Sequence, residues 1–438
     1  MGGGLMQLVA QGAQDVYLTG NPQITFFKMI YKRHTNFAIE TFPVLFDSEL
    51  EFGTKISVDI DRKGDLLSQI FLYLELPKLP TITIDGQDFR SSYINAVGNY
   101  IIEYIEIEIG GQKIDRIYGE WMNILSELII PESKISGYND MIGRYSVLGY
   151  GNNLSNDAQE HVAGEGPLKL FIPIPFWFCN HIGLSLPLVA LQYHDVVINL
   201  KLRDFKDIFY NKTNFMDPDN KPMISPYHNS SSTPKITGHL LCDYIYLDTD
   251  ERKRFAQMSH EYLITQLQFN GDDTLNKNTD IKNIPLQFNH PIKELFWVVQ
   301  TNSSEKLNDH VNYSITVETE PIGIDGVRSI SYLDPITHGT LFINGHERFP
   351  ERQGLYFRLV QPYQKHTRIP SEHIYIYSFG VNPEEMQPSG TCNFSRIDSA
   401  QLTFRFAPNI PNSKIRVYAL NYNVLRIMSG MAGLAYTN

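Results

Sequence analysis

The 438-residue sequence predicts an all-β chain made of two like domains in tandem. Three observations support this prediction. Aromatic residues make up 12% of the chain and are accompanied by 24 prolines and 30 glycines, a balance that favours strands and turns over long helices. Short apolar or alternating runs recur between turn signals. Four of these runs return in the same order in the second half, and a chain of this length is expected to hold about two domains.

The segment 244–269, YIYLDTDERKRFAQMSHEYLITQLQF, is expected to join the two domains. Its aromatic start predicts a strand, and Asp248 followed by Glu251 predicts the cap of a short helix. The residues Tyr262–Phe269 then return to a strand pattern. An ordinary linker is the alternative interpretation, and the internal repeat decides between the two.

The beginning of the chain leaves two interpretations open. Residues 1–20 are small, apolar and poor in charge, and Leu5, Leu8 and Val9 have helical spacing. The segment either packs on its own domain or forms an arm that contacts a neighbouring subunit or an inner shell layer. A small basic cluster follows; it is interpreted as a solvated face, with an anionic contact as the alternative, and consists of Lys28, Lys32, Arg33 and His34.

Several strands are expected in the first half, at Phe37–Phe46, Thr54–Ile60, Leu66–Leu76, Ile101–Ile109 and Val196–Leu202. Leu168–Phe178 is interrupted by two prolines, which indicates an edge strand or a bulge. A helix is expected over Asp115–Ile130, because apolar residues recur there every three or four positions and Pro131 follows. Long loops are expected at 131–166, 205–235, 270–285, 300–312 and 320–340.

The internal repeat consists of four pairs of segments in the same order. They are Leu66–Leu74 with Ile292–Val299, Ile107–Asp115 with Leu341–Phe349, Tyr193–Leu202 with Ile397–Phe406, and His239–Asp248 with Ile415–Val424. Each match alone is weak, but four in register predict a duplicated domain of about 200 residues. Tandem β-domains with long loops leave cupin-like, lectin-like and capsid-like jelly rolls as options.

Composition excludes several classes of function. The formal net charge is -11 and no long basic run occurs, which disfavours a dedicated nucleic-acid binder. Three distant cysteines, Cys179, Cys242 and Cys392, indicate neither a disulfide framework nor a zinc site, and they fit a reducing compartment. No apolar stretch reaches membrane-spanning length. Most of six N-x-[ST] sites are interpreted as chance matches; the six begin at Asn153, Asn211, Asn229, Asn302, Asn312 and Asn393.

No catalytic, cofactor-binding or metal-binding residues are expected. His260-Glu261 resembles the start of a zinc-protease motif, but Ile264 stands where the second histidine is needed, so His260 is interpreted as structural. Cys179 lies near His181 and is interpreted as a buried structural thiol. The remaining candidates are also rejected. Asp217, Asp219 and Asn220 form only an incomplete calcium-like pattern, and His194 and His290 are isolated histidines.

Long strings of the sequence resemble one known family, the major capsid proteins of nucleocytoplasmic large DNA viruses, most closely its chlorovirus-like branch. The strings are GAQDVYLTGNPQITFFK (Gly12–Lys28), TNFAIE (Thr35–Glu40), IEIGGQKID, LPLVALQYHDV (Leu186–Val196), DYIYLDTDERKRFAQ (Asp243–Gln257), HEYLI (His260–Ile264), QPSGTCNFSRID (Gln387–Asp398) and NYNVLRIMSGMAGLAY (Asn421–Tyr436). The resemblance covers nearly the whole chain, whereas loops 131–166, 205–235 and 300–340 match nothing specific.

The resemblance implies a double jelly roll, with two tandem eight-stranded domains and a few short helices. We expect an N-terminal arm over 1–24, a first jelly roll over 25–248 and a second over 249–438. The family is non-enzymatic and forms pseudo-hexagonal homotrimers that tile an icosahedral shell around an inner membrane and DNA. The implied partners are neighbouring capsomers, minor capsid proteins, the inner membrane layer and surface glycans, without sequence-specific nucleic-acid binding. The implied location is the outer shell of the virion, with late assembly in the host cytoplasm.

Two other functions remain as alternatives, a carbohydrate-binding jelly-roll module and a temporary scaffolding relative of a capsid protein. The carbohydrate-binding hypothesis depends on Tyr138, Tyr145 and Tyr150 in the first long loop. Contacts within a trimer are expected partly in the helix at Asp115–Leu128 and in the proline-rich stretch Leu168–Pro187. For Trp121 and Trp177, packing in the core is the simpler interpretation.

Overall fold

The computed structural model describes residues 3–77, 82–84, 87–89, 91–144, 167–211, 235–306, 308–318 and 330–437. The chain divides into two compact units, Met1–Phe37 and Ala38–Asn438. The first unit contains the short helices α1 (Gly3–Val9) and α2 (Val16–Thr19), and neither helix buries a side chain. Asp15 accepts a hydrogen bond from the Gly12 amide at 2.7 Å. None of the described helices is both long and apolar enough to cross a membrane.

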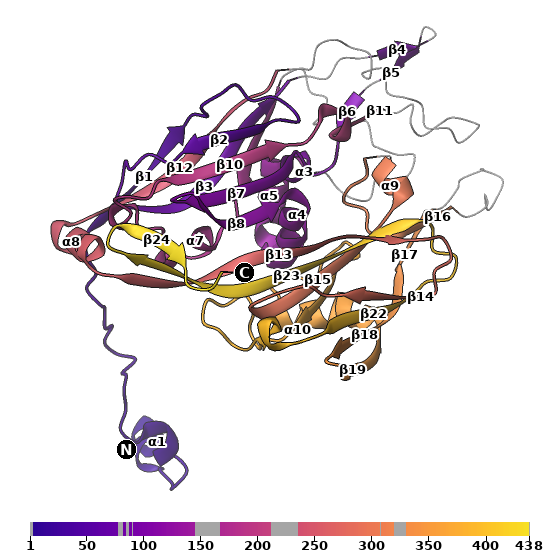
Figure 1. Ribbon diagram of the computed structural model, residues 1–438. Helices are drawn as coiled ribbons and strands as arrows, with labels where there is room; N and C mark the ends of the chain where they lie inside the picture. Colours follow the sequence, from indigo (N-terminus) through magenta and orange to yellow (C-terminus); the bar gives the residue numbers. More distant parts are fainter. Residues whose placement is uncertain are drawn as a thin grey trace. The chain divides into compact units, whose positions relative to one another are not determined.

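The first half of the larger unit contains two four-stranded sheets (Figure 1). The first has the order β1-β12-β3-β9 and consists of β1 (Phe37–Val44), β12 (Thr237–Leu247), β3 (Leu66–Leu76) and β9 (Leu168–Pro173). The second has the order β2-β10-β7-β8 and consists of β2 (Lys55–Asp59), β10 (Val196–Leu202), β7 (Ile102–Ile109) and β8 (Gln112–Tyr118). We call this pair of sheets the first roll.

The second half repeats this plan. One sheet has the order β13-β23-β15-β20 and consists of β13 (His260–Leu275), β23 (Ser413–Met428), β15 (Pro291–Thr301) and β20 (Tyr375–Ser378). The other has the order β14-β22-β18-β19 and consists of β14 (Ile281–Pro285), β22 (Ala400–Phe406), β18 (Ile336–Ile343) and β19 (His346–Gln353). These sheets form the second roll, and β21 (Cys392–Asn393) and β24 (Met431–Leu434) add to the first of them.

The strand orders confirm the internal repeat and the double jelly roll. Each roll has eight strands in its two sheets when the short additional strands are left out, and these eight can be counted in chain order. In both rolls, one sheet has the order first, eighth, third and sixth, and the other has the order second, seventh, fourth and fifth. The four matched pairs of segments fall on β3 and β15, on the hairpins β7-β8 and β18-β19, on β10 and β22, and on β12 and β23. β9 is an edge strand of its sheet, as the prolines of the stretch Leu168–Phe178 predict.

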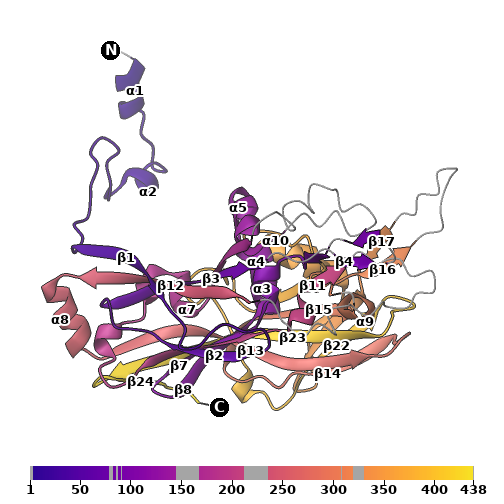
Figure 2. The same cartoon turned by 90° about the horizontal axis from the view of Figure 1, so that it is seen from above.

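Helices and short strands fill the connections. The helices are α3 (Val97–Tyr100), α4 (Gly119–Ile129), α5 (Glu132–Ile142), α7 (Trp177–Asn180), α8 (Thr249–Gln257), α9 (Asn302–Lys306), a π-helical turn (Tyr356–Val360) and α10 (Gln361–Lys365). The short paired strands are β4 (Ile82–Ile84) with β5 (Gln87–Phe89), β6 (Ser91–Tyr93) with β11 (Phe209–Asn211), and β16 (Ile315–Glu318) with β17 (Ile330–Leu333). In Figure 2, β16 and β17 lie at the end of the larger unit opposite α8.

The helix expected over Asp115–Ile130 begins four residues later than predicted. Residues 115–118 belong to β8, which pairs with β7 through the turn at Gly110 and Gly111, both with positive φ. The hydrogen bonds between β7 and β8 therefore hold residues 115–118 in a strand, although their apolar residues have helical spacing. The change from strand to helix needs Gly119, because a Cβ there would lie 2.2 Å from the Asn99 carbonyl oxygen.

Several expected loops contain regular structure. The stretch 131–166 includes α5, and its residues 145–166 lie outside the described part of the chain. The stretch 270–285 is mostly β13 and β14, because a bulge at Gly271, with φ of 86°, lets β13 continue past the turn signal. The stretches 300–312 and 320–340 contain α9, β17 and the start of β18. In 205–235, β11 is present and 212–234 lie outside the described residues.

The joint has the predicted strand–helix–strand form. Asp248 caps α8 by accepting a hydrogen bond from the Glu251 amide at 3.0 Å. Arg252 of α8 forms an ion pair with Asp65 at 2.8 Å, and Asp65 also accepts a hydrogen bond from the Leu247 amide. The end of β12 and the helix are therefore fixed to the same carboxylate, so the connection is held to the first roll.

Candidate functional site: the seam between the two rolls

The contact between the rolls, which we call the seam, includes α4, which lies against the sheet β13-β23-β15-β20 (Figure 1). Trp121 of α4 lies edge-on to Phe296, with ring centroids 4.8 Å apart, and 5.8 Å from Tyr418. Phe296, Val298 and Tyr418 belong to the same buried cluster as the core of the first roll. The first core therefore extends across the seam onto the outward face of the second roll.

Directly beside Trp121, a buried ion pair joins the two rolls. Glu120 accepts a hydrogen bond from Arg416 of β23 at 2.7 Å and another from the Tyr418 hydroxyl. Arg416 also pairs with Asp272 at 2.9 Å. Burial lowers the pKa of Arg416, but Glu120 and Asp272 outweigh it, so its pKa lies above the ordinary value. The guanidinium therefore stays charged and holds carboxylates of both rolls.

A second ionic cluster lies at the far end of α4. Arg144 bridges Glu127 at 2.5 Å and Glu372 of the second roll at 3.2 Å, and all three side chains are buried. Arg368 of the second roll reaches Glu127 at 3.2 Å. Burial raises the pKa of Glu372 to about 8 despite Arg144, whereas Arg144 and Arg368 together hold the pKa of Glu127 below its ordinary value. The pKa values of these two carboxyl groups thus shift in opposite directions, because Glu127 has two cationic partners.

The seam also contains a group of aromatic residues near α9. The Tyr100 hydroxyl donates to the His310 carbonyl at 2.8 Å and lies 2.7 Å from the Tyr313 hydroxyl. The rings of Tyr100 and His310 are stacked, with centroids 5.1 Å apart. Burial lowers the pKa of His310 to about 4, so this ring is neutral at pH 7. These contacts fix the second roll to α3 without adding charge.

Two edge strands, β8 and β13, meet at the seam without forming a continuous ladder. The Asp115 carboxylate of β8 accepts hydrogen bonds from the Leu267 amide of β13 at 3.2 Å and from the Arg116 amide at 2.9 Å. The Gln266 side chain donates to the Ile114 carbonyl in the other direction. Burial raises the pKa of Asp115 to about 7. Side chains thus satisfy edge groups that would otherwise be open to another strand.

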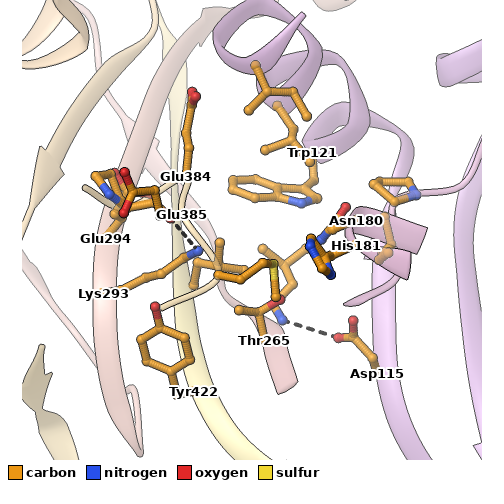
Figure 3. Close-up of a pocket in the computed structure, with 18 of the residues that line it drawn as sticks. Asp115, Trp121, Asn180, His181, Thr265, Lys293, Glu294, Glu384, Glu385 and Tyr422 are labelled. Carbon is orange, nitrogen blue, oxygen red and sulfur yellow. Dashed lines mark hydrogen bonds between the residues drawn. The ribbon is translucent and has the colours of Figure 1, made fainter. Parts of the chain in front are cut away.

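A pocket of about 420 Å³ opens along this contact (Figure 3). Trp121 and Asp115 line one side, and Lys293 and Glu294 of β15 line the other. The buried Lys293 ammonium donates to the Pro383 carbonyl at 2.9 Å, and burial lowers its pKa.

His366 also lines this pocket and lies between two carboxylates. Its ring nitrogens are 3.0 Å from Glu294 and 2.9 Å from Glu384. Burial lowers the pKa of His366, but the two carboxylates prevail and raise it to about 9. His366 therefore pairs with two of the carboxylates that line the pocket.

The residues that sequence reasoning considered for chemistry do not come together. The His260 ring lies 2.8 Å from the Phe255 carbonyl oxygen. Burial raises the pKa of the Cys179 thiol to about 12, as expected of a structural cysteine. His181 accepts a hydrogen bond from the Gly183 amide at 2.9 Å. Within the described part of the chain, no group of three or more acidic, histidine or cysteine residues could hold a metal ion.

Other predicted positions are placed as follows. Trp121 and Trp177 are both 2% exposed and belong to the core. Tyr138 packs against the first core from α5, so it is not part of an exposed aromatic loop. His194 contacts the Ala432 backbone at 3.1 Å, and the His290 amide donates to Ser395. Several candidates lie outside the described residues, namely Tyr145, Tyr150, Asp217, Asp219 and Asn220.

Comparisons with known proteins agree with the architecture. Residues 25–248 match the family described as major capsid protein N-terminus, and residues 251–433 match the family of large eukaryotic DNA virus major capsid proteins. The chain belongs to this family. As a member, it is a structural protein of the virion shell, where it assembles with neighbouring capsid subunits.

Individual relatives resemble the chain over its whole length. It is 41% identical over 463 residues to the major capsid protein of Pyramimonas orientalis virus and 39% identical over 528 residues to that of Phaeocystis pouchetii virus, with all of each chain covered. A solved PBCV-1 virus capsid matches with a TM-score of 0.75 and 31% identity, covering 94% of this chain and 100% of that one. The Faustovirus major capsid protein, at 12% identity and a TM-score of 0.70, shares the fold.

Proposed function

We propose that three copies of the chain form a capsomer with a pseudo-hexagonal outline, and that such capsomers tile an icosahedral shell. The observation that carries this proposal is the repeat of one strand order in two rolls of a single chain. Three chains with two like rolls each place six like units in one ring. A closed ring also covers surfaces that would be left open in a single chain.

The buried seam supports this function because a tile must keep its two halves in one orientation. Glu120, Arg416 and the cluster around Arg144 fix the rolls through directional contacts, which resist sliding more than apolar packing alone does. We propose a non-enzymatic role, an N-terminal arm over 1–24, and rolls over 25–248 and 249–438. Minor capsid proteins, an inner membrane layer and surface glycans are proposed partners, and late assembly in the host cytoplasm is the proposed route.

The solution mass of the purified chain tests the proposal. We expect a particle near three times 50.3 kDa, with a hexagonal outline in negative-stain images of the same chromatographic peak. A mass of one chain that persists at high protein concentration would contradict the capsomer. A glycan screen on that single-chain species would then test the carbohydrate-binding alternative.

A further inference from the structure

The two rolls differ in how their corresponding sheets are covered. In the second roll, α4 packs on the outward side of β15, and every residue of Ile292–Thr301 is buried. In the first roll, β3 occupies the corresponding position, but its burial alternates: Leu72 and Leu74 are fully buried, whereas Phe71 and Tyr73 are half-buried. Within the described part of the chain, the outward side of β3 therefore remains partly exposed, unlike that of β15 under α4.

The outward side of the first roll's sheet carries a patch of aromatic and aliphatic side chains, with the charged residues Glu75, Lys169 and Asp243 around it. The Tyr73 ring lies 5.0 Å from Phe171 and 4.9 Å from His239, and Phe171 is 41% exposed. We call this patch the open face; it consists of Phe71, Tyr73, Phe171, His239 and Leu241. Alternating strands with one polar side are the usual solution for a sheet that faces water. An aromatic patch on that side instead indicates an interface.

The second roll carries a helix at the position that α4 has in the first. β19 leads into a helical stretch over residues 354–365, which comprises the π-helical turn and α10. When the sequence of β8 is aligned with that of β19 at their first residues, the same alignment without gaps pairs three residues of α4 with three residues of this stretch. The pairs are Trp121 with Leu355, Leu125 with Leu359, and Ile129 with Tyr363.

The two helices present these corresponding residues to different surroundings. Trp121 is buried in the seam, and Leu125 and Ile129 line its pocket. In the second-roll helix, Leu359 and Tyr363 are 37% and 77% exposed. The opposite side of that helix is buried in its own roll through Phe357 and Gln361. Among the described residues, the second-roll helix thus has a partly exposed apolar side, and no helix covers the open face of the first roll.

We propose that the open face of the first roll binds the second-roll helix, residues 354–365, of a second copy of this chain. The contact between chains would follow the arrangement of α4 on β15 and β23 within one chain. The partner is a second copy because the chain already contains this contact once, between its own rolls. Such a contact is head-to-tail, so each copy uses both surfaces, and a ring closes when the rotation permits. The number of copies in that ring rests on the proposed capsomer.

Two single substitutions test the two surfaces separately. Leu359→Glu places a charge on the helix, and Phe171→Glu places one on the open face; both residues are partly exposed, so the fold should survive. We expect the solution mass of each variant to fall from three chains to one, with an unchanged circular dichroism spectrum. Ile281→Glu is the matched control, because Ile281 is 50% exposed on the other sheet of the second roll. Its mass should remain that of the wild type.

Mixing the two variants tests the head-to-tail geometry. The Leu359→Glu chain keeps an intact open face and the Phe171→Glu chain keeps an intact helix, so the mixture can form one contact and should give a species of two chains. Variants that keep the three-chain mass would overturn this docking while leaving the capsomer intact. Loss of assembly in Leu359→Glu but not in Phe171→Glu would show that the helix binds elsewhere or to another partner. A wild-type mass of one chain would instead contradict the capsomer itself.

Discussion

Strands β3 and β15 hold the same place in their rolls but have different surroundings. Both lie third along the strand order of their sheet, β3 next to β12 and β15 next to β23. β15 is buried on both sides, whereas the outward side of β3 remains half-buried. The difference arises from what lies outside the sheet, because α4 covers one strand and, in the part of the chain that the structure describes, no corresponding helix covers the other. Duplicated domains can therefore acquire unequal surfaces through their connections alone.

The largest expected effect comes from removing the cover of β15. Trp121→Ala should lower the free energy of unfolding by about 4 kcal/mol, because the indole fills the space between Phe296 and Tyr418 and a cavity would replace it. Urea denaturation measures this loss of free energy, at a protein concentration where the solution mass is that of one chain. Leu355→Ala, at the corresponding exposed position of the second roll, is the control and should cost less than about 1 kcal/mol. Equal losses would contradict the difference between the two sheets.

Removing the guanidinium at the seam should have the next largest effect. Arg416→Met leaves Glu120 buried without its cation, and breaking a buried pair costs about 3 kcal/mol. Arg426→Met is the control on the same strand, since its pair with Glu261 is exposed and should contribute less than about 1 kcal/mol. A double-mutant cycle with Glu120→Gln measures the coupling. Additive losses would show that the pair does not hold the rolls together.

The seam should also make the chain less stable as pH rises from about 6.5 to about 8. Burial raises the pKa of Glu372 to about 8 and that of Asp115 to about 7, so the folded chain retains protons that the unfolded chain has released. The stability from these protons is complete below the unfolded pKa and is lost as pH rises through the folded pKa. We expect a fall of at most about 1.4 kcal/mol per pH unit for each group.

Unfolding by urea at pH 6.5, 7 and 8 measures this slope. His366, with its pKa raised to about 9, acts in the same direction, whereas His310, with its pKa lowered to about 4, acts below this range. Glu372→Gln should flatten the slope, and Glu261→Gln, at an exposed carboxylate, should leave it unchanged. A slope that is unaffected by Glu372→Gln would assign the pH dependence to other groups.

The smallest expected effect concerns the joint between the rolls. Asp248→Ala removes the cap of α8 and should cost about 1 kcal/mol, because the Glu251 amide loses its partner. Asp250→Ala, in the exposed first turn of the same helix, is the control and should cost less. The two thermal midpoints measure the difference. Equal shifts would indicate that charge near the helix start, and not the cap, is what stabilises the joint.

Most of the fold could be predicted from the sequence, because strands and turns leave local signals. The four repeated segments and the Asp248 cap depend on neighbouring residues, and the structure confirms both. The start of α4 could not be predicted, because pairing with β7 extends β8 over residues with helical spacing. The bulge at Gly271 likewise extends a strand through a turn signal.

The seam was missed because its partners lie far apart in the sequence. Glu120 and Arg416 meet only after both rolls have formed, and no local pattern marks them as a pair. A weak signal existed in Glu120, an acidic residue next to Trp121 at the start of a helix whose residues are mostly apolar. The expected trimer contact at this helix needs revision, since the chain's own second roll covers its apolar side. Phe171, in the other expected stretch, does remain exposed.

The long strand β23 has a mechanical consequence. It pairs with β13 from Ser413 opposite Leu275 to Ile427 opposite His260, and its end pairs with β24, where Ala432 contacts His194 of the first roll. These hydrogen bonds run perpendicular to the strands. A pull along β23 would load them together in shear, whereas a pull at a hairpin end would open them one at a time. Tension in a shell that follows this direction would therefore be shared by the whole ladder.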